Sequence, residues 1–141
     1  WRKFNMADIS NINPQLRDVE IIHPGTGLKL GISVTVCSID DPLLTRVKRS
    51  ITDERMRLEQ KNKAMKAADI EENRIKILQT AIRGWNWYSP TGNDDDIPTY
   101  KGEVPEYIPA NVRAILSEEK MRWFGDQINA EISETESFFA K

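Results

Sequence analysis

The chain carries, at residues 18–38, the stretch DVEIIHPGTGLKLGISVTVCS, which decides the class of fold. In its second half, apolar residues alternate with small or polar ones, and this period of two is typical of a half-buried β-strand. Its first half is a short run rich in β-branched residues. The segment between them, HPGTG at residues 23–27, consists of residues that favour turns. The stretch therefore predicts a β-hairpin.

Two helices are predicted after the hairpin. Asp41 can cap the first and Pro42 suits its first position, so apolar residues at spacings of three, four and seven predict a helix over 42–66. The second half of this helix is almost entirely polar, which favours an end that projects into solvent or onto a partner. Asp69 resembles the start of a capping box and predicts a second helix over 69–84. Its broad apolar face includes Ile70, Ile75, Leu78, Ala81, Ile82 and Trp85.

The rest of the chain alternates between irregular and helical patterns. Residues 1–17 read as an irregular lead-in, and residues 86–108 as a long loop rich in proline and glycine. A short helix is predicted over 109–116. Ser117 can cap a last helix over 118–138, whose first turn is acidic as the helix dipole favours.

These elements predict an α+β fold that is mostly helical and forms a single domain over residues 18–139. One N-terminal β-hairpin is expected to pack against about four helices. An isolated hairpin is only marginally stable in water. Its apolar face therefore has to lie on these helices or on the sheet of another subunit.

Composition limits the classes of function. The chain is 39% hydrophobic and 30% charged, which is too apolar for a disordered chain and too charged for a membrane protein. No apolar run approaches the roughly 18 residues of a membrane span, and no secretory signal is visible. Cys37 and His23 are the only cysteine and histidine, so neither an intrachain disulfide nor a zinc cluster is predicted. We expect a cytoplasmic protein without a cofactor.

No residue pattern predicts catalysis. His23 lies in a turn without a nucleophile or an orienting acid at a readable spacing, and Cys37 ends a predicted strand. The consecutive acids at 94–96 lack the alternating oxygen ligands and the glycine of a calcium-binding loop. We therefore predict no catalytic, cofactor-binding or metal-binding residues and expect the protein not to be an enzyme.

Charge is distributed unevenly along the chain. Residues 46–66 hold eight bases and three acids, whereas residues 93–141 hold eleven acids and five bases. Such a chain could pair with itself, stack head-to-tail with copies or bind a charged partner. Nucleic acid explains the bases less well, because the whole chain is acidic and no aromatic residues alternate with the bases.

Four aromatic residues are the candidate protein-binding residues. Tryptophan and tyrosine are the commonest anchors of interfaces. We assign Trp85 to the core and keep Trp87 and Tyr88 as candidates for binding. Phe138 and Phe139 would form an exposed apolar end that favours association. Docking of this end onto the hairpin is the alternative.

Three segments resemble those of a known family: VEIIHPGTG at residues 19–27, AIRGW at 81–85 and IPANVRAILS at 108–117. The order of elements, from the hairpin through a charged helix to an acidic helical tail, also resembles that of the same family. Over about residues 8–139 the chain resembles the tail assembly chaperones of long-tailed bacteriophages and prophages. The residues that carry the resemblance are packing and turn residues, and none is catalytic.

The resemblance implies a function in phage tail assembly. Such a protein binds the tape measure protein, keeps its long and partly apolar chain soluble, and passes it to the tail tube protein in the cytoplasm of the bacterial host. The resemblance also implies self-association. Two other functions stay open: a structural tail component that is retained in the virion, and a small nucleic-acid-binding regulator that uses the helix over 42–66.

Overall fold

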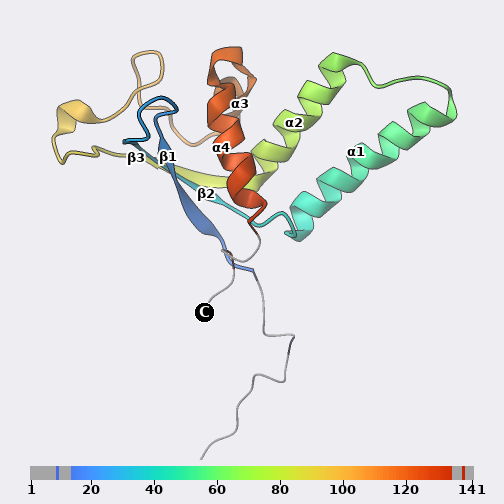
Figure 1. Cartoon of the computed structure of the whole chain (residues 1–141), viewed down its shortest axis with the longest axis horizontal. Helices are drawn as coiled ribbons and strands as arrows, with labels where there is room; N and C mark the ends of the chain where they lie inside the picture. Colours follow the sequence, from blue (N-terminus) through green and yellow to red (C-terminus); the bar gives the residue numbers. More distant parts are fainter. Residues whose placement is uncertain (1–8, 10–13, 135–137, 139–141) are drawn as a thin grey trace, which may run out of the picture.

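The computed structural model describes residue 9, residues 14–134 and residue 138 (Figure 1). Its three strands form one antiparallel sheet in the order β1 (Arg17–Ile22), β2 (Lys29–Val36), β3 (Ile82–Trp87). The α-helices are α1 (Pro42–Gln60), α2 (Ala67–Ala81), α3 (Pro109–Ser117) and α4 (Arg122–Ile132). The 3-10 helices η3 (Asp94–Asp96) and η4 (Glu119–Met121) lie between β3 and α4. This architecture confirms the predicted α+β fold class.

The predicted hairpin is present as β1 and β2. The two strands are antiparallel, with Val19 opposite Val34. His23 shapes the turn between them, because its Nδ1 accepts hydrogen bonds from the backbone N–H groups of Gly25 (2.9 Å) and Thr26 (3.1 Å). The histidine therefore has a local structural role in the loop of the hairpin.

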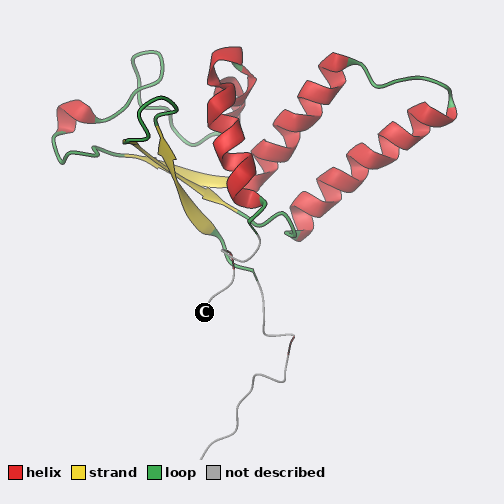
Figure 2. Ribbon diagram, viewed as in Figure 1, coloured by secondary structure: helices red, strands yellow, loops and turns green. Residues whose placement is uncertain are grey.

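One face of the sheet carries the core. Directly opposite residues of antiparallel strands point to the same face, so Val19, Val34 and Trp85 share it. The helices gather on this side of the sheet (Figure 2). Asp18 and Thr35 lie on the other face, which is polar and partly open to solvent. The helical contribution to the core consists of Leu44, Ile75, Leu78, Ala81, Val112, Ile115, Leu116, Phe124, Ile128 and Ile132.

The helix predicted over 69–84 is wrong at its C-terminal end. It is present as α2, which ends at Ala81, and the next six residues form β3. Trp85 therefore lies in a strand, and the sheet has three strands instead of the two of the hairpin. The physical reason is that β2 offers a second edge, whose backbone groups pair with those of β3.

The helix predicted over 42–66 is wrong at the same end. It is present as α1, which ends at Gln60. Asn62 has a positive φ of 57°, and the N–H of Lys63 donates a hydrogen bond to the carbonyl of Leu58 (2.9 Å). This pattern is a Schellman motif, in which a left-handed residue closes the helix.

Two predicted helix caps are also wrong. α2 begins after Lys66, which makes no capping hydrogen bond, and Asp69 lies within its first turn. There its charge still suits the helix dipole. Ser117 ends α3, and its hydroxyl donates to the carbonyl of Arg113 (2.6 Å). The helix predicted over 118–138 is present as η4 followed by α4, which ends at Ile132, and residues 135–137 of the predicted range lie outside the described residues.

The other predicted ranges have mixed outcomes. The helix predicted over 109–116 is confirmed as α3. The irregular segment predicted over 86–108 begins only after β3 and contains η3 and one isolated β-bridge. The predicted lead-in at 1–17 lies mostly outside the described residues, and Arg17 already belongs to β1.

α1, α2 and the loop between them form a helical arm over residues 42–81, which extends away from the sheet (Figure 1). Leu44, near the start of α1, is the one buried side chain of that helix. Asp41 fixes the base of the arm. Its carboxylate accepts hydrogen bonds from the N–H groups of Leu43 (2.9 Å) and Leu44 (3.2 Å) and pairs with Arg83 of β3 (2.8 Å).

Replacing Asp41 by alanine is expected to lower the free energy of unfolding by about 1–2 kcal/mol, since the helix cap is lost with the ion pair. Asp41→Asn keeps a side chain that caps helices equally well, so the expected loss is below about 1 kcal/mol. Urea unfolding of both variants at neutral pH measures the two values. Equal losses would contradict the capping role.

Asp41 also predicts a dependence of stability on pH. Burial by itself raises the pKa of Asp41, but hydrogen bonds from Arg83 and from the backbone outweigh it and leave this pKa below its ordinary value. The stabilisation is therefore fully present above the unfolded pKa of about 3.9 and is lost as the pH falls through the lower folded pKa. The stability difference between the native chain and Asp41→Asn should shrink below about pH 4.

Candidate protein-binding site

The chemistry-bearing side chains of the described residues are not gathered into a reactive centre. No group of three or more His, Cys, Asp or Glu among these residues could hold a metal ion. Cys37 is buried, and this burial raises the pKa of its thiol, which disfavours the nucleophilic thiolate. The other candidates for function are the aromatic residues predicted to bind protein and the hollows on the surface.

Trp87 and Tyr88 are adjacent in sequence but lie on opposite faces of the sheet. Trp87 ends β3 on the face that carries the core, and its half-buried ring meets Trp85 edge-on, with 5.8 Å between centroids. The backbone pairing of β3 with β2 continues at Tyr88, whose N–H donates a hydrogen bond to the carbonyl of Gly31. The hydroxyl of Tyr88 is hydrogen-bonded to Glu20 on the polar face. This bond raises the pKa of Tyr88. The two candidate residues therefore do not form one surface.

Trp85 packs against the core and anchors the segment that follows the sheet. Its indole Nε1 donates a hydrogen bond to the carbonyl of Pro105 (3.0 Å), and its ring meets Tyr107 edge-on at 5.7 Å. The Tyr107 hydroxyl donates to the carbonyl of Ile82 (2.8 Å). These contacts hold the segment around Pro105 and Tyr107 against β3.

Phe138 docks onto the N-terminal part of the chain. Its side chain is 2% exposed and belongs to the core. Its carbonyl accepts a hydrogen bond from the N–H of Gln15 (2.6 Å), and its ring lies 5.9 Å from the guanidinium carbon of Arg17. This arrangement corresponds to the docking alternative rather than to an exposed apolar end. Phe139 lies outside the described residues.

An open groove runs along the helical arm. Two adjoining hollows of about 450 and 410 Å³ share Arg55, Met65 and Ile70. The first reaches the loop at the tip of the arm, and the second continues between α1 and α2 to Ile51 and Ile77. We call both hollows the arm groove, defined by the apolar residues Ile51, Met65, Ile70 and Ile77 and by the basic residues Arg55 and Lys63.

The apolar floor of the arm groove is accessible. Ile70 is 57% exposed, and Ile51, Met65 and Ile77 are half-buried. The side-chain amide of Asn73 contacts the sulfur of Met65 (3.3 Å). Removing apolar surface from water contributes a favourable free energy of roughly 25 cal/mol for each Å² that is buried. A partner that covers Ile70 and its neighbours would gain this free energy.

The rim of the arm groove is basic. Arg55 and Lys63 are exposed, and no ion pair between described residues involves either of them. Arg74 lines the inner part of the groove and is paired with Glu71 (3.1 Å). Glu59 also lines the groove as a single acid. The charge available to a partner at this rim is therefore mainly positive.

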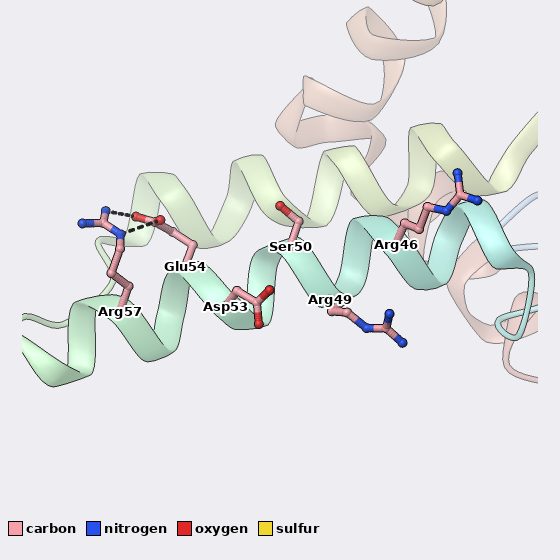
Figure 3. A pocket seen from close by; sticks show the side chains of 6 residues that line it. All are labelled: Arg46, Arg49, Ser50, Asp53, Glu54 and Arg57. Atoms are coloured by element: carbon pink, nitrogen blue, oxygen red, sulfur yellow. Dashed lines mark hydrogen bonds and ion pairs between the residues drawn. The ribbon is translucent and has the colours of Figure 1, made fainter.

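A separate hollow on α1 is polar. Figure 3 shows the side chains that line it, Arg46, Arg49, Ser50, Asp53, Glu54 and Arg57. Arg57 is hydrogen-bonded to the Glu54 carboxylate, with 3.0 Å between Nε and Oε2. The bases are thus interspersed with acids, and none of the described residues that line this hollow is apolar. It has the character of a solvated charged face.

Sequence reasoning misses the arm groove. It assigns Ile70 to the apolar face of a core helix, whereas the structure leaves this side chain exposed at the outer end of α2. The available signal is the polar second half of the helix predicted over 42–66, which already favours a projecting end. The packing of α1 against α2 is a tertiary feature, and it cannot be predicted from the apolar pattern of either helix alone.

No helix in the described part of the chain combines the length and the apolar character needed to cross a membrane. Comparison of the chain with known protein families, with curated protein sequences and with solved structures finds no match.

Proposed function

We propose that the protein is a non-catalytic, tail assembly chaperone-like protein that binds the tape measure protein of a long-tailed phage and keeps it soluble during tail assembly. The observation that supports this function is the open arm groove, whose apolar floor includes an isoleucine that is 57% exposed. A protein that holds a helical client needs such an accessible apolar surface on a soluble, charged scaffold.

The arm groove has properties that suit reversible holding. An amphipathic helix binds by laying its apolar stripe into a groove of this kind. Met65 is unbranched and polarisable, so it can adapt to different client side chains. The groove is shallow and open along the arm, so that a bound helix stays accessible to the next partner. In our proposal this next partner is the tail tube protein, in the cytoplasm of the bacterial host.

Self-association is part of the same proposal. The arm is rich in bases and the C-terminal half of the chain is rich in acids. Copies could therefore attract one another head-to-tail, in a manner that salt would weaken. The identity of the client and of the receiving protein rests on the resemblance of the three segments described above.

Co-expression with the tape measure protein tests the function. We expect the client to be insoluble alone and to form a soluble complex with the native chain, detected by affinity pull-down and light scattering. Ile70→Glu should reduce the captured client at least about tenfold, because a charge would be buried against its apolar stripe. Met56→Glu is the matched control, since Met56 is a 51% exposed residue of α1 that lines neither hollow.

Two results would contradict the proposal. If the client stays insoluble and the chain elutes alone, the chain does not hold this client. If Ile70→Glu and Met56→Glu capture as much client as the native chain, the client binds elsewhere. The far-ultraviolet circular dichroism of both variants verifies that the helices are intact.

A further inference from the structure

We infer that the arm groove takes a single amphipathic helix whose apolar stripe is bordered by acidic side chains. This inference rests on the proposed function and names the chemical class of the segment that is bound. Two properties of the groove carry it: the spacing of its exposed apolar residues, and the sign of the unpaired charge at its rim.

The apolar spacing matches a helix. Ile70 and Ile77 are seven residues apart on α2, which corresponds to two helical turns and about 10 Å. A client helix with apolar residues at positions i, i+4 and i+7 presents a stripe of the same length. Met65 lies near the tip of the arm and adds one more apolar side chain to the floor of the groove.

The charge at the rim of the groove determines which side chains can flank the apolar stripe of the client helix. Arg55, Lys63 and Glu59 are exposed at the rim and have no ion-pair partner in the described residues, so two cations face one acid and the unpaired charge is net positive. Both cations line the hollow at the loop end of the groove, Arg55 from α1 and Lys63 from just beyond the C-terminus of that helix. Acidic side chains that flank an apolar stripe would reach these two cations, whereas basic ones would be repelled.

Neither nucleic acid nor a second copy of this chain fits as well. The apolar residues of the groove are isoleucines and a methionine, and no aromatic side chain among the described residues lines it for base stacking. The acidic helix α4 of another copy has its own apolar stripe buried, since Phe124, Ile128 and Ile132 are at most 1% exposed. The occupant is therefore an acidic amphipathic helix of another protein.

Two synthetic helical peptides test the inference. Both have about 18 residues, or five turns, with leucines at i, i+4, i+7 and i+11. Glutamates flank the stripe in one peptide and lysines in the other. Fluorescence anisotropy with the full-length chain should give at least about tenfold tighter binding of the glutamate peptide at low salt. The double variant Arg55→Glu/Lys63→Glu should reverse this preference.

The double variant Arg46→Glu/Arg49→Glu is the matched control. It changes the net charge by the same amount on exposed residues of α1 that lie outside the arm groove. The preference for the glutamate peptide should remain in this variant. A preference that disappears equally in both variants would show an effect of total charge and would overturn the inference.

The remaining outcomes separate the inference from the proposed function. If both peptides bind equally, or neither binds, while co-expression still solubilises the tape measure protein, the inference is overturned and the proposed function stands. If the glutamate peptide binds as expected and co-expression fails, the groove specificity stands and the client was misidentified.

Discussion

Replacing Gly31 by alanine is expected to lower the free energy of unfolding by about 3 kcal/mol or more. Gly31 has a φ of +93°, a conformation that alanine rarely adopts. Its Cβ would overlap the carbonyl oxygen of Tyr88 and lie 2.9 Å from Cδ of Pro90. The carbonyl of Gly31 also accepts the hydrogen bond from the N–H of Tyr88 (2.7 Å), so the clash would separate β2 from the end of β3.

Gly27→Ala is the matched control for this prediction. Gly27 has a similar φ of +73°, but a Cβ built there meets no atom of the described residues within 4 Å. The backbone conformation alone should cost about 1 kcal/mol. Urea unfolding followed by tryptophan fluorescence measures both variants. If both lose the same free energy, the close approach between Gly31 and Tyr88 does not exist in solution.

Phe138→Ala is expected to lower the free energy of unfolding by about 3–5 kcal/mol, the usual effect of removing a buried phenylalanine ring. The side chain of Phe138 is 2% exposed, and removal of its ring would leave a cavity next to Arg17 of β1. Leu16→Ala is the control, because Leu16 is 55% exposed in the adjacent N-terminal segment and should change stability by less than about 0.5 kcal/mol.

The alternative role of Phe138 gives a different result. If Phe138 formed an exposed binding surface, its replacement would leave the unfolding transition unchanged and reduce capture of the tape measure protein. We expect the opposite for Phe138→Ala: a shifted transition, with capture retained at a low temperature where the variant is folded.

The hairpin and the fold class could be predicted because their signals are local. The alternation along β2 and the turn residues near His23 lie within one continuous stretch, and the hydrogen bonds to His23 Nδ1 join residues two and three positions apart. Asp41 at the start of α1 is local in the same sense, since it caps the residues that follow it.

The third strand could not be predicted because its partner is distant in sequence. Up to Ala81 the apolar residues follow a helical period, and Ile82 and Trp85 continue it by coincidence. The helix ends because the following residues pair with the second edge of β2, which places Trp85 opposite Val34. Once this strand is known, the positions of Trp87 and Tyr88 on opposite faces follow from the period of two.

The candidate site depends on how two helices are placed relative to each other. The Schellman motif around Asn62 turns the chain back, and it leaves Met65 and Ile70 at the outer end of the arm. Each of these residues suits a core equally well in a sequence pattern. They are accessible because they lie outside the part of α2 that packs in the core, which includes Ile75, Leu78 and Ala81.

Hydrogen exchange of the complex with the tape measure protein is the most direct test of the central claim, that the helical arm holds the client. Mass spectrometry would compare the exchange rates of backbone amides in the free and the client-bound chain. The account predicts slower exchange over residues 51–77, which contain the arm groove, and little change in β3. Protection confined to residues 82–88, with the arm unchanged, would contradict it and place the client on the sheet.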